Sequence, residues 1–105
     1  MTDKLMVFVT CKGKEQAAAI AQALVEGKLA ACVNVLPAVQ SCYTWEKQVT
    51  WSEEVLMIIK TTRSRFSQLQ AKILELHTYE VPEIVGLEIE DGLDKYLEWI
   101  EASVT

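Results

Sequence analysis

The fold is decided by two runs of sequence, Leu5-Met6-Val7-Phe8-Val9 and Val55-Leu56-Met57-Ile58-Ile59. Both runs are apolar at every position and rich in β-branched or aromatic residues, which favours β-strands. Successive side chains of a strand point to opposite faces of the sheet. Strands that are apolar at every position therefore predict a sheet that buries side chains on both of its faces.

A helix is expected after the first of these strands, over residues 14–26. Its apolar side chains recur at the spacing of one helical face, and Gly27 is well placed to end it. These side chains are Ala17, Ile20, Ala21, Leu24 and Val25.

Two strands joined by a hairpin are expected between residues 29 and 62. The first runs from Leu29 to Trp45, with an edge, bulge or bend at Pro37 because proline cannot donate a ladder hydrogen bond. Glu46-Lys47-Gln48 is the polar interval that predicts the hairpin tip, although it lacks the Asn-Gly signature of a tight turn. The returning strand includes residues 55–59 and closes at Thr62.

The rest of the chain predicts a second helix, a fourth strand and a third helix. Thr62 or Ser64 is expected to cap the second helix, and Pro82 prevents its continuation. The fourth strand covers residues 84–89, and Asp91 is expected to cap the last helix. The apolar faces of the two helices are Phe66, Leu69, Ile73 and Leu76, and then Leu93, Tyr96, Leu97 and Ile100.

The predicted order is β-α-β-β-α-β with an added C-terminal helix, in a single domain over residues 1–105. This is an α+β, ferredoxin-like arrangement, in which two crossover helices cover one face of a four-stranded antiparallel sheet. The other face also carries apolar side chains, and one terminal helix covers only part of it. Exposed apolar patches larger than about 600 Å² normally mark an interface, so we expect a homo-oligomer.

Composition excludes several classes of function. Half of the 105 residues are hydrophobic, and ten Lys and Arg against fifteen Asp and Glu give a net charge of −5. That sign disfavours nucleic acid as a partner, and no apolar stretch is long enough to predict a membrane segment. Three cysteines without a CxxC pair disfavour a disulfide framework or structural zinc, so we expect a cytoplasmic protein.

A short segment around Pro82 carries the side chains best suited to bind an ion or a small polar ligand. His77, Tyr79, Glu80 and Glu83 offer imidazole, phenol and carboxylate groups within a few residues. The alternative for His77 is a position at the C-terminal end of a helix, where the dipole favours an imidazolium.

Each of the other candidate site residues also has a purely structural interpretation. Cys11 and Cys42 are possible soft-metal ligands or packing residues, and Lys60 is a cleft residue or a strand-end lysine. The hairpin aromatics are interface anchors or cross-strand pairs, and Glu53-Glu54 is expected to be a solvated strand end. The hairpin aromatics are Tyr43, Trp45 and Trp51.

No catalytic constellation is evident. The sequence contains no GxGxxG, GxxxxGK[ST], HExxH or GxSxG motif, so we expect neither an enzyme nor an organic cofactor.

Several of these segments together resemble the CutA divalent-cation tolerance family, over essentially the whole chain. They are Lys28-Leu29-Ala30-Ala31-Cys32-Val33-Asn34-Val35-Leu36-Pro37, Tyr43, Trp45, Ile59-Lys60-Thr61-Thr62, His77-Thr78-Tyr79-Glu80-Val81-Pro82-Glu83-Ile84 and Tyr96-Leu97-Trp99-Ile100. The resemblance implies a cytoplasmic ferredoxin-like homotrimer that is linked to tolerance of copper and other divalent ions. In such a trimer the extended hairpin formed by the second and third strands would continue the sheet of a neighbouring subunit.

The resemblance also implies a metal site built from a cysteine near the end of the first strand, a histidine and a glutamate. His77 and Glu83 match that pattern, whereas Thr10 aligns with the cysteine position and Cys11 lies one residue further. A one-residue shift turns a strand side chain to the opposite face.

Two other functions stay open. CutA trimers resemble the PII signalling proteins, which bind small effectors between subunits, and Tyr43, Trp45, Lys60, His77, Tyr79 and Glu83 would line such a cleft. The trimer could also be a scaffold for a partner protein.

Overall fold

The computed structural model describes residues 2–105 and confirms the α+β, ferredoxin-like fold, with the predicted order of elements and the added C-terminal helix. A single 3-10 turn, Arg63–Arg65, interrupts that order. The elements are β1 (Lys4–Cys11), α1 (Lys14–Glu26), β2 (Cys32–Trp45), β3 (Gln48–Thr62), α2 (Phe66–Leu76), β4 (Ile84–Glu88) and α3 (Asp94–Ser103).

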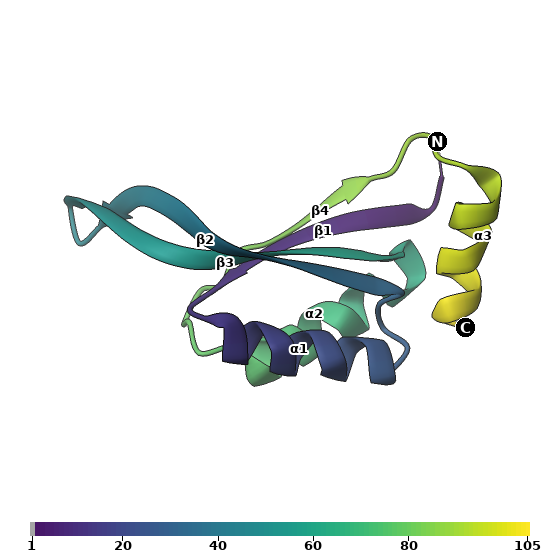
Figure 1. Ribbon diagram of the computed structural model, residues 1–105, viewed down its shortest axis with the longest axis horizontal. Coiled ribbons are helices and arrows are strands. Elements are labelled where there is room, and N and C mark those ends of the chain that lie inside the picture. The colour runs from purple at the N-terminus through teal and green to yellow at the C-terminus, as the bar shows by residue number, and fades with distance from the viewer. Residues whose placement is uncertain (1) are drawn as a thin grey trace.

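The four strands form one antiparallel sheet in the order β2-β3-β1-β4. Helices α1 and α2 cover one face, the opposite face is bare along most of its length, and α3 stands across one end of the sheet (Figure 1). We call the bare side the open face. Val7 pairs with Ile59 on the helix-covered side, whereas Phe8 pairs with Ile58 on the open face.

Alternation along the central strands separates the core from the open face. Every second residue of β1 is buried against the helices, from Leu5 to Cys11, and Met57 and Ile59 of β3 are wholly buried beside them. Ile20 and Leu24 of α1 close this core from the other side. Each large aliphatic side chain buried here contributes about 1.5–3 kcal/mol.

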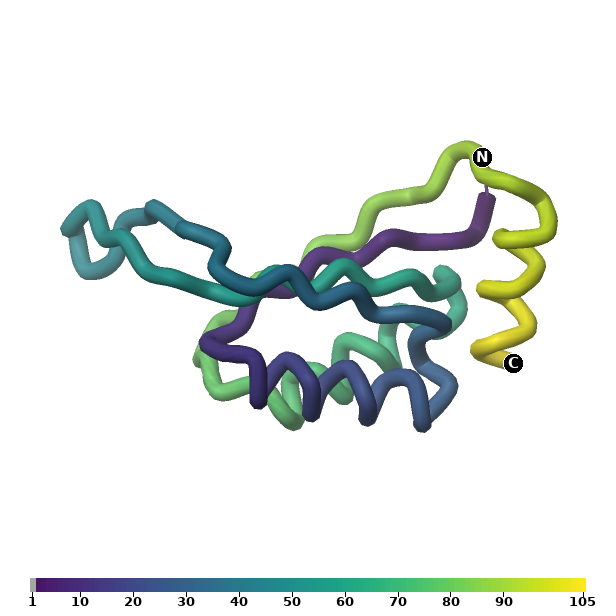
Figure 2. The backbone as a smooth tube through the Cα atoms, in the orientation of Figure 1, coloured from purple at the N-terminus to yellow at the C-terminus, as the bar shows by residue number. Residues whose placement is uncertain are grey.

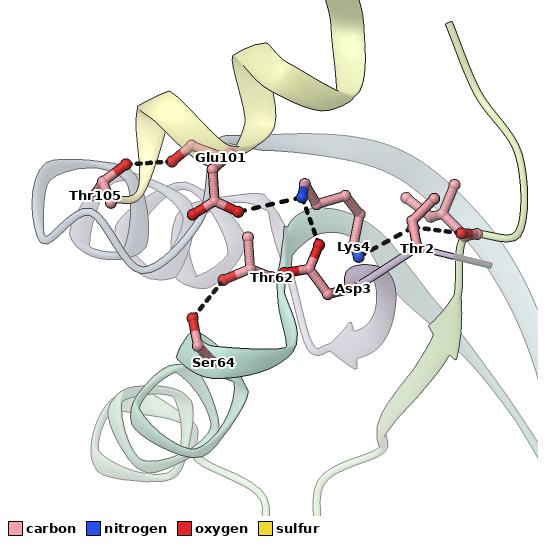
Figure 3. A network of polar contacts seen from close by, with 8 residues as sticks. Thr2, Asp3, Lys4, Thr62, Ser64, Glu101 and Thr105 are labelled. Atoms are coloured by element: carbon pink, nitrogen blue, oxygen red, sulfur yellow. Dashed lines mark hydrogen bonds and ion pairs between the residues drawn. The ribbon is translucent and has the colours of Figure 1, made fainter. Parts of the chain in front are cut away.

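Helix α3 is held against the end of the sheet by a small second core and by polar contacts. Ile100 and Val104 are buried with Ala31. The Lys4 ammonium reaches both Asp3 and Glu101, so that the start of β1 is tied to α3 (Figure 3). This helix therefore covers only the end of the open face, as the sequence predicts.

The β2–β3 hairpin extends far beyond the body of the molecule (Figure 2), and the chain is accordingly 45 Å long but only 25 and 22 Å in its other dimensions. The sequence predicts an edge, a bulge or a bend at Pro37, and the structure shows a bulge in the edge strand β2, with a register shift between Leu36 and Val39. The strand predicted from Leu29 begins only at Cys32.

Gly27 ends α1 as predicted, but the predicted N-terminal caps of α2 and α3 are wrong. Asp91 lies outside α3, which begins at Asp94. Neither Thr62 nor Ser64 caps α2, because the 3-10 turn intervenes and Arg65 stands before the helix. The hydroxyls of Thr62 and Ser64 instead share a hydrogen bond of 3.1 Å.

The predicted apolar faces of α2 and α3 are confirmed except at Leu76, Leu93 and Tyr96, which are exposed. Leu69, Ile73 and Ile100 are fully buried, whereas Leu76 and Leu93 are 37% and 73% exposed. Leu76 is the last residue of α2, and Leu93 precedes α3. None of the helices within residues 2–105 is long and apolar enough to cross a bilayer.

Candidate functional site

Two of the candidate side chains, His77 and Tyr79, lie where three segments meet: the end of β1, the root of the β2–β3 hairpin and residues 77–83. Residue 77 follows α2 directly in an extended conformation, with φ −78° and ψ 144°, so the chain leaves the helix and crosses the end of the sheet toward β4. Proline at position 82 cannot extend a helix, which keeps this segment open.

Both ring nitrogens of His77 are occupied. Nδ1 accepts a hydrogen bond of 3.0 Å from the Tyr79 backbone N–H, so Nε2 carries the proton and donates to the Thr10 carbonyl at 2.7 Å. The imidazole is therefore neutral in this arrangement and fastens the end of α2 to β1. A metal ion at Nδ1 would have to replace the hydrogen bond from Tyr79.

Tyr79 joins the same segment to the hairpin root. Its hydroxyl donates to Oε2 of Glu54 at 2.7 Å, and its ring lies 4.7 Å from that of His77. Burial and the bond to Glu54 raise the pKa of the Tyr79 phenol far above its usual range. Glu54 is only 8% exposed, so the prediction of a solvated Glu53-Glu54 strand end is wrong for this residue.

Cys11 points away from any open site. Its side chain is fully buried on the helix-covered face, with Sγ 3.8 Å from the Gly13 carbonyl and 4.0 Å from the Met57 sulfur. Burial raises the pKa of this thiol, and the Glu54 carboxylate adds to the effect. The structure therefore does not support Cys11 as a metal ligand, because strand alternation turns it into the core while Thr10 faces the opposite side.

The three side chains expected to hold a metal ion do not converge within one chain. Glu83 is exposed, His77 is half-buried and Cys11 is buried. Across residues 2–105, no three His, Cys, Asp or Glu side chains form a group that could hold a metal ion. His77 and Glu83 both lie in the segment of residues 77–83.

A cleft of about 350 Å³ lies at the hairpin root, between β3 and the loop that leads from β1 into α1. Two lysines and two carboxylates line it, which suits a small polar molecule better than an apolar one. Its lining residues are Lys12, Gly13, Lys14, Pro37, Ala38, Glu53, Glu54 and Val55.

The residues predicted to line one effector cleft are spread over the chain. Lys60 lies on the open face, where its ammonium is bound by the Asn34 side chain. Tyr43 bonds Ser52 within the hairpin, and Trp45 lies at the hairpin end with 61% of its surface exposed. Tyr79 of the predicted group contacts the cleft, through its hydrogen bond to Glu54.

Large apolar side chains are exposed on the open face and on the hairpin. Met6 pairs with Leu87 and Phe8 with Val85, so these side chains share the open face. Leu87 and Val85 are 49% and 46% exposed. The exposed hairpin side chains are Tyr43, Trp45, Val49 and Trp51.

Sequence reasoning missed Glu54 and the two lysines of the cleft. Glu54 sits in a polar stretch of a strand, and nothing in its neighbours along the chain distinguishes a buried carboxylate from a solvated one. Lys12 and Lys14 flank a glycine before a helix, a pattern common in ordinary loops. Their proximity to the hairpin root depends on the register of β1 against β3.

Comparison with known proteins agrees with this architecture. The family model of the CutA1 divalent ion tolerance protein matches residues 5–103. The divalent-cation tolerance protein CutA of Thermus thermophilus is 44% identical over 90% of this chain and 92% of its own length. The chloroplastic CutA protein of Arabidopsis thaliana is 42% identical over 94% of this chain, which spans about half of that longer relative.

Solved structures give the same result. CutA of Xylella fastidiosa superposes with a TM-score of 0.97 at 32% identity, covering 99% of this chain and 100% of the other. The Cut A1 protein of Thermus thermophilus superposes with a TM-score of 0.95 at 41% identity, covering 97% and 99%. The chain thus belongs to the CutA1 divalent ion tolerance family.

Proposed function

We propose that the protein works as a homotrimer in divalent-cation tolerance, and that its open face and hairpin form the subunit contacts. The exposed apolar side chains of β4, β2 and the hairpin support this proposal. The chain exposes 6714 Å², whereas a monomer of 11.8 kDa is expected to expose about 5,900 Å². The additional surface is what an assembly would cover.

Light scattering coupled to size exclusion tests the assembly. The wild type is expected to elute with the mass of three chains. Leu87→Lys places a charge on the open face and should give monomers, because an unpaired charge is costly inside an interface. Leu74→Lys is the matched control, since Leu74 is 52% exposed on α2, on the helix side. A monomeric wild type at micromolar concentration, or equal effects of the two variants, would contradict the proposal.

We also propose that tolerance involves direct binding of copper or another divalent ion by His77 and Glu83. Imidazole nitrogen and carboxylate oxygen suit Cu²⁺, and Glu83 is exposed. Because the ion would displace the Tyr79 N–H from Nδ1 of His77, we expect weak binding. The buried thiol of Cys11 takes no part.

Isothermal titration with CuCl₂ tests this site. His77→Gln keeps an N–H donor for the Thr10 carbonyl and should weaken binding about tenfold, or about 1.4 kcal/mol. Glu83→Gln should have a similar effect. Cys11→Ala is the control and should bind as the wild type does. Equal affinity in the wild type and His77→Gln would remove His77 from the site.

The cleft at the hairpin root favours a second candidate function, a signalling module that binds a small polar effector between subunits. Native mass spectrometry of the trimer after exposure to cell extract is the test. A retained small molecule, lost in Lys12→Ala together with Lys14→Ala, would favour this function. A trimer that retains nothing would argue against it.

We propose that the protein is not an enzyme and that it resides in the cytoplasm, where its three free cysteines would stay reduced. A scaffold role would use the exposed tryptophans of the hairpin. Pull-downs with Trp45→Ala and Trp51→Ala would detect a lost protein partner.

A further inference from the structure

The hairpin leaves the body at a weak point of the sheet. Between the pairs Leu36–Leu56 and Val39–Glu54, two residues of β2 stand opposite the single residue Val55. One of the two is Pro37, which has no N–H to donate, and the other is Ala38, with φ 61°. Such a bulge bends the strands and interrupts the hydrogen-bond ladder locally.

Neighbouring strands do not support the hairpin beyond this point. β1 ends at Cys11, opposite Val55, so β3 pairs only with β2 from Glu54 to the tip. A two-stranded ribbon of this kind is marginally stable by itself. Its direction relative to the body therefore depends on contacts at the root.

One such contact is the hydrogen bond from Tyr79 to Glu54. Within residues 2–105 it is the one side-chain hydrogen bond between the body and residues 39–54. The carboxylate is buried, and Tyr79 is itself fixed through His77 to the Thr10 carbonyl. A continuous chain of hydrogen bonds thus connects β3, just past the bulge, to the end of β1.

We propose that Tyr79 is a positioning residue that locks the β2–β3 hairpin at the bulge, so that its aromatic end is held in place for a second copy of the chain. The proposal rests on the self-association inferred above. Without the bond, the free energy favours a Glu54 side chain that turns toward water, because a buried carboxylate without a hydrogen-bond donor is unfavourable. The ribbon then swings at Pro37 and Ala38, and assembly must restore its direction.

Two variants break the bond from opposite sides. Tyr79→Phe removes the donor and keeps the ring, and Glu54→Ala removes the acceptor together with the side chain that holds the hairpin root. In both, hydrogen exchange of residues 39–53 is expected to quicken about tenfold while β1 amides keep their rates. The trimer dissociation constant should also rise about tenfold.

Glu54→Gln is the rescue, since its amide oxygen still accepts the Tyr79 hydroxyl, and it should behave as the wild type does. Tyr96→Phe is the matched control, because it removes a tyrosine hydroxyl from α3 instead. It should leave the hydrogen exchange of the hairpin unchanged. Unchanged hairpin exchange in Tyr79→Phe and Glu54→Ala would overturn the lock. Global unfolding of both variants would also overturn the proposal, because the lock predicts an effect confined to the hairpin. If the wild type is a monomer, the proposed self-association is refuted but the lock is not. Hydrogen exchange of the monomeric variants would still test the lock.

Discussion

At the scale of the residue, the most informative side chains are those whose surroundings change their chemistry. Tyr79 and Cys11 both lie near the end of β1, and both hold their protons more firmly than free side chains do. In each case burial is the main cause, because it disfavours the charged form. Neither shift marks a nucleophile, since both groups are kept in their less reactive state at neutral pH.

Tyr79 should make stability fall at alkaline pH. Its pKa is raised above the ordinary value of 10.0, so its contribution is complete below pH 10 and is lost as pH rises further. Tyr79→Phe should therefore cost about 1–2 kcal/mol at pH 8 and less near pH 11. Guanidinium denaturation across this range measures the difference. A cost that grows with pH would show that the phenol is not held in its neutral form.

Cys11 should be protected from alkylation until the chain unfolds. Its thiol is fully buried and its pKa is raised, so little thiolate is present or accessible. Peptide mapping after iodoacetamide treatment at pH 8 should find Cys11 unlabelled in the native protein and labelled in guanidinium. Labelling of native Cys11 at the rate of the unfolded chain would contradict the buried placement.

At the scale of the element, the hairpin is the part whose geometry is least favoured locally. Its turn places Glu46 and Lys47 at φ 50° and 65°, so both central residues adopt the left-handed conformation. Type I′ turns of this kind prefer Asn-Gly, because other side chains are strained there. The length of the strands and the pairing from Val39 to Trp45 hold the turn in place instead.

Replacing the turn by Asn-Gly should stabilise the hairpin. Glu46→Asn together with Lys47→Gly relieves the strain at two positive-φ positions, which is worth about 1 kcal/mol. Slower hydrogen exchange at residues 43–45 and 48–50 would show that the hairpin is more stable. The reverse order, Glu46→Gly with Lys47→Asn, is the control for composition. Faster exchange in the Asn-Gly variant would mean that the turn has another conformation in solution.

At the scale of the whole molecule, the chain is elongated for its length. Its radius of gyration is 14.3 Å, whereas a compact domain of this length is expected to have about 13 Å. The projecting hairpin and the bare sheet face account for this shape (Figure 1). Half of the residues are hydrophobic, and one core with a small second core at α3 buries only part of them.

Thermal stability should depend on protein concentration. If folding and assembly are coupled, a hundredfold increase in concentration should raise Tm by several degrees, because binding partners stabilise the folded state by mass action. Leu87→Lys should remove this dependence and lower Tm. Differential scanning calorimetry at two concentrations measures both. A Tm that does not change with concentration would indicate that the chain is stable without its copies.

The order of elements, the interruption of β2 at Pro37, the apolar side chains on both sheet faces and the family could all be read from residue patterns, since each depends on local spacing or on motifs along the chain. The position of Cys11 in the core, the bond from Tyr79 to Glu54 and the occupied nitrogens of His77 depend on something else. They follow from strand register and from how residues 77–83 cross the end of the sheet, which brings together side chains far apart in sequence. Local sequence patterns do not determine such long-range contacts, so only the tertiary structure decides which polar side chains meet.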